Sequence, residues 1–159
     1  MIKKLFLLLI FFLIGFATAV SADTFFRHTI QDLYQWTTNN AIQFGGKAFY
    51  LFGNPLYFIS FGIAFVVFSI ANEKKAFLKI FLNILFLISI FSISLIVICG
   101  RDANLFVHLC SDCSNGIKRL GYDEINYGLN LSAATVISII PSLIKIVLET
   151  RKASAQQRI

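Results

Sequence analysis

Residues 55–99 read PLYFISFGIAFVVFSIANEKKAFLKIFLNILFLISIFSISLIVIC and carry the strongest structural signal in the chain. Two apolar runs, residues 55–71 and 76–99, are joined by the polar break Asn72-Glu73-Lys74-Lys75. A helix that crosses a bilayer needs about 20 mostly apolar residues, and basic residues gather in cytoplasmic connections. Asn54 and Pro55 form a good helix start, because Asn caps free amides and Pro lacks one. The stretch therefore predicts a transmembrane helical hairpin over residues 54–99.

The composition of the whole chain points the same way. Of its 159 residues, 57% are hydrophobic and 14% are charged, whereas soluble domains carry about 25% charged residues. A soluble fold with this composition would lack a water-facing surface. We therefore expect a single all-α membrane protein that is in contact with membrane lipid.

The net charge of +6 does not indicate a nucleic-acid partner. The Lys and Arg residues stand at the ends of apolar runs and form no basic stripe with interleaved aromatic residues. Such a distribution is typical of residues that orient membrane helices.

Residues 1–22 have the three parts of a secretory signal. Lys3 and Lys4 precede an apolar core at residues 5–16, and small residues follow at 17–19 and 20–22, which are two candidate cleavage sites. The core is short for a spanning helix, which favours a cleavable signal peptide. An uncleaved signal anchor is the alternative.

Residues 23–46 predict an extracytoplasmic amphipathic helix. Apolar and small residues recur at helical spacing, and polar residues such as Arg27 and Gln31 lie elsewhere on the helix. Trp36 and Tyr34 suit the membrane interface. Two placements remain open, one on the membrane surface and one against the protein's own membrane domain. The apolar stripe consists of Phe26, Ile30, Leu33, Thr37, Ala41 and Phe44.

The remainder of the chain predicts a loop, a third span and a tail. Residues 100–130 are polar by the standard of this chain and form an extracytoplasmic loop that contains cysteines and one short helix around residues 103–109. Residues 131–149 form the third transmembrane helix, and residues 150–159 form a cytoplasmic tail. One face of the third helix carries a polar stripe that either packs against other helices or faces a pore. The stripe consists of Ser132, Thr135, Ser138, Ser142 and Lys145, with Glu149 at its end.

Three cysteines invite a chemical interpretation. Cys110 and Cys113 form a C-x-x-C pair close to His108, but no βαβ pattern surrounds them, so redox catalysis of the thioredoxin kind is not expected. The set is one ligand short of a structural zinc site, so we expect no metal and no cofactor. In an oxidising compartment the default is a disulfide, formed by Cys110 with Cys113 or by Cys99 with either.

Lys79 and Asn83 lie one turn apart on the second helix of the hairpin. An ionisable residue within a span is a functional candidate. Lys79 and Lys145 both lie near predicted cytoplasmic ends and can extend to the surface, and Asn83 can hydrogen-bond between helices. No acidic residue lies within a span, and phosphate-binding and hydrolase motifs are absent from the sequence. We therefore expect a protein that is not an enzyme.

The charge pattern orients the chain. Residues 74, 75, 79, 151, 152 and 158 supply a dense basic set to the predicted cytoplasmic side, whereas the extracytoplasmic segments have fewer basic residues per length. The positive-inside rule then predicts a multi-pass protein of the bacterial inner membrane with a cytoplasmic C-terminus.

The layout over residues 1–99, a signal, an amphipathic segment and a hairpin with a basic turn, resembles the pilin-type subunits of conjugative type IV secretion systems. The cysteine loop and the third span depart from that layout. The resemblance implies a non-enzymatic subunit of a secretion- or conjugation-type envelope assembly, with a homo-oligomer or other membrane proteins as partners. Two alternatives remain, a holin-like pore-former and a membrane thiol-redox protein that uses Cys110 and Cys113.

Overall fold

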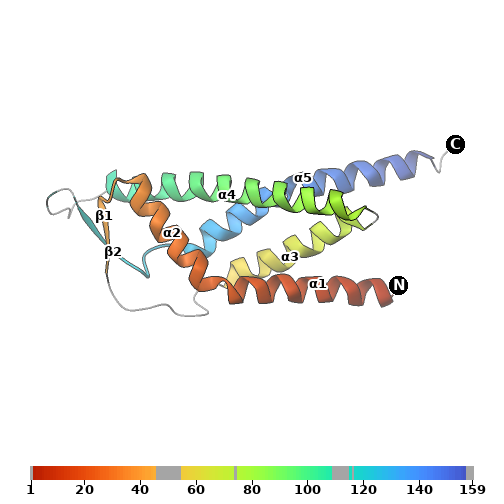
Figure 1. The fold of residues 1–159 in the computed structure, drawn as a ribbon, viewed down its shortest axis with the longest axis horizontal. Helices are drawn as coiled ribbons and strands as arrows, with labels where there is room; N and C mark the ends of the chain where they lie inside the picture. The colour runs from red at the N-terminus through yellow and green to blue at the C-terminus, as the bar shows by residue number, and fades with distance from the viewer. Residues whose placement is uncertain (1, 46–54, 74, 109–114, 116, 157–159) are drawn as a thin grey trace.

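The computed structural model describes residues 2–45, 55–73, 75–108, 115 and 117–156. Over these residues the chain forms an elongated helical bundle with a two-stranded sheet at one end (Figure 1). In chain order the elements are α1 (Ile2–Ser21), α2 (Asp23–Thr37), β1 (Ile42–Gly45), α3 (Pro55–Asn72), α4 (Phe77–His108), β2 (Lys118–Gly121) and α5 (Tyr127–Gln156).

The described residues include four helices that are long and apolar enough to cross a membrane, namely α1, α3, α4 and α5. The all-α membrane class is therefore supported, whereas the expected count of three spans did not include α1. The helix α4, with 32 residues, is about 48 Å long and exceeds a hydrocarbon core of about 30 Å. One end of α4 therefore projects beyond the membrane.

Close approach of two backbones joins α1 to α3. A Cβ atom built on Gly15 would lie 2.7 Å from the carbonyl oxygen of Phe61, and one built on Gly62 would lie 2.6 Å from the ring of Phe12. Ala19 of α1 is fully buried. Small residues let membrane helices approach in this way, so α1 packs as an integral helix of the bundle.

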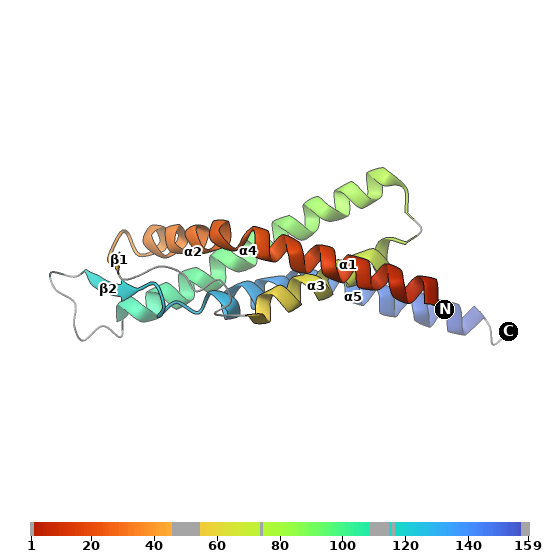
Figure 2. The same cartoon turned by 90° about the horizontal axis from the view of Figure 1, so that it is seen from below.

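The two helices of the predicted hairpin diverge. The extensively packed pairs of spanning helices in the described chain are α1 with α3, α3 with α5, and α4 with α5, and the pair of α3 and α4 is not among them. From below, the first half of α4 leans away from the other helices (Figure 2). The sequence thus predicts the two apolar helices, while the structure separates them after their connection.

Both helices that flank the predicted cysteine loop are longer than expected. The helix α4 continues through Gly100 to His108, and α5 begins at Tyr127 rather than at residue 131. Gly100 lies inside α4 and is buried against α2. A Cβ atom built on it would lie 3.2 Å from a methyl carbon of Thr37. The polar character of residues 100–108 therefore reflects the end of a helix outside the apolar span.

The helix α2 is shorter than the predicted segment 23–46. It ends at Thr37, and Asn39 and Asn40 follow with positive φ angles of 51° and 60°, a conformation that stops a helix. The chain then enters β1, which pairs in parallel with β2 so that Ile42 lies opposite Lys118. This small sheet ties the end of α2 to the segment before α5.

The interlock of α1 and α3 can be tested with Gly15→Ala. The added methyl group would meet the Phe61 backbone, which cannot move aside cheaply, and overpacking of this kind costs about 1–3 kcal/mol. Gly45→Ala is the matched control, because its Cβ position has no neighbour within 4 Å and a Gly→Ala change gains a similar amount of backbone entropy in a helix and in a strand.

Thermal unfolding of the purified full chain in detergent should show a lower midpoint for Gly15→Ala and an unchanged or higher midpoint for Gly45→Ala. Equal midpoints for the two variants would contradict the packing of α1 on α3.

Candidate functional site

The helix α2 docks on the bundle through polar residues. Asp23, Arg27, Gln31 and Tyr34 recur at intervals of four, four and three and lie on one face, and each is at most 7% exposed. Trp36, by contrast, is 71% exposed. The structure thus places α2 against the protein's own membrane helices, which is one of the two placements that the sequence left open. It also buries Arg27 and Gln31, which the sequence analysis assigned to a face away from the packed stripe.

An ion pair occupies the first part of this face. Asp23 Oδ2 accepts a hydrogen bond from Arg27 Nε at 2.9 Å, and Asp23 Oδ1 accepts one from the hydroxyl of Tyr57 on α3. The Arg27 guanidinium lies 4.9 Å from the ring centroid of Tyr127 on α5, within range of a cation–π interaction. Both buried charges therefore have partners from more than one helix.

A second set of contacts continues along the same face. Gln31 Nε2 donates to the Tyr127 hydroxyl at 2.9 Å, and the Tyr34 hydroxyl donates to Asp102 on α4. Asn130 of α5 lies beside them, with Nδ2 3.3 Å from the Tyr34 oxygen and 3.4 Å from Asp102 Oδ2. Burial raises the pKa of the Tyr34 phenol above its ordinary value, and the hydrogen bond to Asp102 raises it further.

We call these side chains the polar network. Its members come from four helices, so the network fastens α2 to α3, α4 and α5 together. The partners satisfy the buried charges and amides, which is the condition for a buried network to fix one conformation. The described residues contain no cluster of three or more potential metal ligands. The polar network consists of Asp23, Arg27, Gln31 and Tyr34 of α2, Tyr57 of α3, Asp102 of α4, and Tyr127 and Asn130 of α5.

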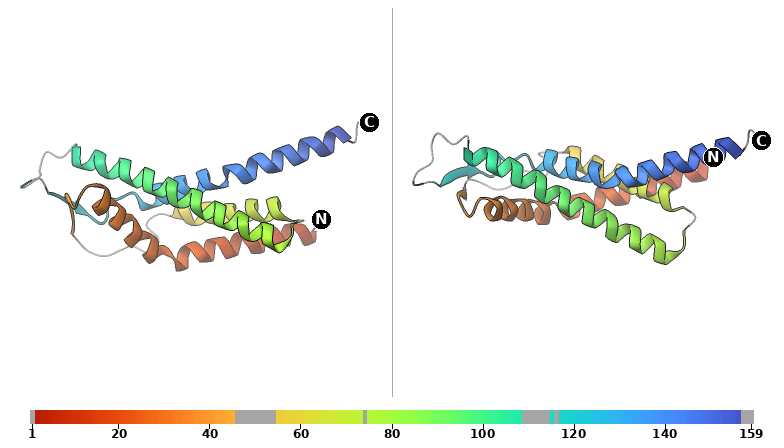
Figure 3. Two further views of the ribbon diagram at one scale, coloured as in Figure 1. Left: turned by 45° about the horizontal axis from the view of Figure 1, so that its top comes forward. Right: turned by 90° about the horizontal axis from the view of Figure 1, so that it is seen from above.

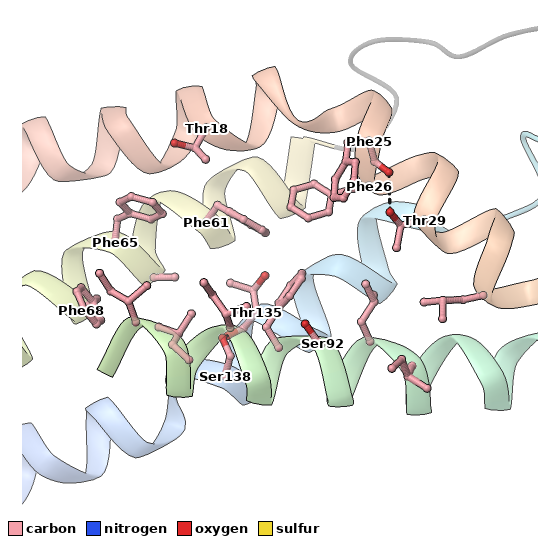
Figure 4. Close-up of a pocket in the computed structure, with 18 residues that line it drawn as sticks. Thr18, Phe25, Phe26, Thr29, Phe61, Phe65, Phe68, Ser92, Thr135 and Ser138 are labelled. Atoms are coloured by element: carbon pink, nitrogen blue, oxygen red, sulfur yellow. Dashed lines mark hydrogen bonds between the residues drawn. The ribbon is translucent and has the colours of Figure 1, made fainter. Parts of the chain in front are cut away.

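An aromatic triangle lies beside the polar network. Phe26 of α2, Phe61 of α3 and Phe91 of α4 have ring centroids 5.4–5.9 Å apart, the range of favourable aromatic pairs. The triangle forms part of the wall of an apolar cavity between α3 and α4 (Figure 4). No sequence pattern indicates this cavity, because it results from the divergence of two helices.

The structure brings most of the predicted polar stripe of α5 into the bundle. Ser132, Thr135 and Ser138 are buried, and Ser142 is half-buried. Thr135 and Ser138 donate to backbone carbonyls of their own helix at 2.7 Å, whereas Ser132 Oγ has no hydrogen-bond partner within the described parts of the chain. The stripe therefore supplies small side chains for helix packing inside one copy of the chain.

The polar residues predicted near the other end are partly brought together. Lys145 Nζ donates to the carbonyl oxygen of Ala71 at 3.0 Å, at the C-terminal end of α3, where a cation is favourable. Asn83 Nδ2 donates to Asn72 Oδ1 at 2.6 Å and thus joins α4 to α3. Lys79 is exposed and takes no part in these contacts.

The predicted cysteine site is described only at Cys99, which is buried with a free thiol. Cys110 and Cys113 lie outside the described residues, so their pairing with each other stays a prediction. No disulfide involving Cys99 is present.

Sequence analysis missed the polar network. The spacing of Asp23, Arg27, Gln31 and Tyr34 could have identified a polar face. Their partners Tyr57, Asp102 and Asn130 lie far along the chain and share no motif, so tertiary packing alone brings them together. No protein-family model, curated protein or solved structure matches this chain.

The contact between Tyr34 and Asp102 can be measured with a double-mutant cycle. Tyr34→Phe and Asp102→Ala should each lower the free energy of unfolding by about 1–3 kcal/mol, because each leaves a buried or half-buried polar group with fewer partners. The double variant should lower the free energy of unfolding by less than the sum of the two single-variant changes. Asp32→Ala, at an exposed position on α2, is the control and should change the free energy by less than about 0.5 kcal/mol. Additive effects would mean that the contact is absent.

The raised pKa of Tyr34 also predicts a pH dependence. In the unfolded chain the phenol ionises near pH 10, its ordinary value, whereas the folded chain holds it neutral to higher pH. The stability from this contact is therefore complete below pH 10 and decreases as the pH rises above it. Thermal midpoints of the wild type and Tyr34→Phe should run in parallel from pH 7 to 9, and the wild type should fall more steeply above pH 10. Parallel curves above pH 10 would contradict the raised pKa.

Proposed function

We propose that this chain is a non-enzymatic subunit of a bacterial envelope assembly of the secretion or conjugation type, which acts by packing its membrane helices against partners. The observation that carries the proposal is the exposure of α4. Of the most apolar 18-residue stretch of α4, 6% is buried inside the chain, compared with 11% for α1, 39% for α3 and 33% for α5. The longest spanning helix is thus the one that the chain itself covers least.

The exposed face of α4 is continuous. Large apolar residues recur along it at intervals of three or four, apart from a gap between Leu85 and Ile93, so they form one stripe along the helix. The stripe is free of charge. Such a face fits a second copy of the chain or another membrane protein. The stripe includes Leu78 (67% exposed), Leu82 (55%), Leu85 (46%), Ile93 (63%) and Val97 (63%).

The placement of the basic residues supports an inner-membrane orientation. The start of α1, the connection between α3 and α4, and the end of α5 lie at one end of the molecule (Figures 1 and 3). This end carries Lys3, Lys4, Lys75, Arg151 and Lys152. By the positive-inside rule it faces the cytoplasm, which places α2 and the small sheet on the outer side and the C-terminus inside.

We further propose that α1 remains as a signal anchor and is the first of four spans. The interlock of Gly15 with α3 and the full burial of Ala19 support its retention. Cleavage after Ala22 would also create a charged amino group at Asp23, which is 3% exposed, and burial of a charge is costly.

The holin-like alternative gains no support from the described geometry. Thr135 and Ser138, which a pore would turn toward water, donate their hydroxyls to their own helix. The thiol-redox alternative depends on Cys110 and Cys113, outside the described residues.

Crosslinking and native mass measurement test the proposal. A photo-crosslinking amino acid at Leu82 on α4 should capture a second copy or a partner membrane protein in intact membranes. The same amino acid at Ile59 of α3, which is 44% exposed, is the matched control and should give much less product. The native mass in mild detergent should correspond to at least two chains of 17.9 kDa, or to one chain with a partner protein, which bound lipid alone cannot give.

Monomers alone, with no crosslinked chain from Leu82, would refute the proposed assembly role. The intact mass of the purified chain reports on α1 separately, because cleavage at residue 22 would remove the whole helix.

A further inference from the structure

The cavity between α3 and α4 has a volume of about 660 Å³ and walls from all five helices (Figure 4). Phenylalanine dominates the lining, with Phe61, Phe65 and Phe68 on α3 facing Phe91 on α4. Four of the walls belong to helices that are long and apolar enough to cross a membrane, so in the proposed topology the part of the cavity between α3 and α4 lies within the hydrocarbon and α2 lines its outer end.

Fixed contacts at both ends hold the cavity open. At one end, Asn83 of α4 bonds to Asn72 of α3 close to their short connection. At the other end, Tyr57 of α3 and Asp102 of α4 are both bonded to α2 through the polar network. The two helices are therefore fastened to α2 at one end and to each other near their connection, and closing the space between them would disturb hydrogen bonds that are buried or part-buried.

The walls offer an occupant almost no hydrogen bonds. The hydroxyls of Thr18, Thr29, Thr135 and Ser138 point to backbone carbonyls of their own helices, at 2.7–2.9 Å. A peptide backbone or a polar headgroup placed here would lose its partners, at high cost in an apolar site. Hydrocarbon loses nothing and replaces the dispersion contacts that an empty space forfeits.

The dimensions favour a single chain of hydrocarbon. The lining residues of α4 extend from Ile84 to Ile96, or about 18 Å along the helix axis, which compares with about 15 Å for half of a hydrocarbon core of about 30 Å.

We propose that the cavity binds one acyl chain of a membrane phospholipid, inserted sideways between α3 and α4. The lipid is a structural ligand held inside one copy of the chain, so this site is distinct from the partner-binding face proposed for α4.

The test uses a matched pair of variants on α4. Ser92 is exposed and points into the cavity, whereas Ser89, one turn earlier, is exposed but does not line it. Ser92→Phe should fill the cavity, and Ser89→Phe adds the same side chain outside it. The full chain is incorporated into vesicles of phosphatidylethanolamine and phosphatidylglycerol with a diazirine in one acyl chain, purified in detergent and then irradiated.

The wild type and Ser89→Phe should retain about one phospholipid per chain, with the label on cavity-lining residues of both helices, such as Phe61 and Phe65 of α3 and Ile84 and Ile88 of α4. Ser92→Phe should retain at least ten-fold less. If Ser92→Phe does not fold, as judged by helical content and monodispersity, Thr29→Phe fills the same cavity from α2 and is expected to give the same loss.

Equal retention by the cavity-filling variant and the wild type would overturn the proposal. Label confined to the exposed stripe of α4, or a retained mass that belongs to a protein chain, would overturn it as well.

Discussion

The ion pair between Asp23 and Arg27 is the interaction on which the arrangement of the helices depends. Both side chains are almost fully buried, so each would be costly without a partner, and the loss of one partner of such a pair costs about 3–5 kcal/mol. The additional partners are Tyr57 of α3 and the ring of Tyr127 of α5. Because these partners come from different helices, the polar side chains of α2 can reach all of them only when α2 occupies one position on the bundle.

The docking of α2 explains the shape of the membrane domain. Tyr57 joins α3 to α2, and Asp102 joins α4 to α2, so the two helices are held through a third element instead of along a shared interface. The helix α3 instead packs on α1, through Gly15 and Gly62, and on α5. The separation leaves the phenylalanine-lined cavity on one side of α3 and the exposed stripe of α4 beyond it.

Prediction from sequence succeeded where one local property dominates. The apolar runs that became α3, α4 and α5 were identified because hydrocarbon requires long uninterrupted apolar helices. It is less successful at helix ends, because a loop with a separate short helix around residues 103–109 is expected, whereas residues 100–108 continue α4 without a break. Composition cannot separate a loop from a helix end outside the membrane, because both are polar. The stripe of α5 was found by its spacing, yet its burial inside the chain depended on which helix became its neighbour.

Hydropathy and charge along the chain are sufficient to predict the membrane class, three of the helices that are apolar and long enough to cross a membrane, the polar stripe of α5 and the basic residues beside these helices. Tertiary packing sets the other features, because α1 packs with α3, α2 turns its charged face inward, and α3 and α4 separate around a cavity. These features depend on pairs such as Tyr34 with Asp102, 68 residues apart. No periodic pattern in the sequence identifies such a pair. The free-energy cost of burying a polar group depends on the partner that folding places beside it.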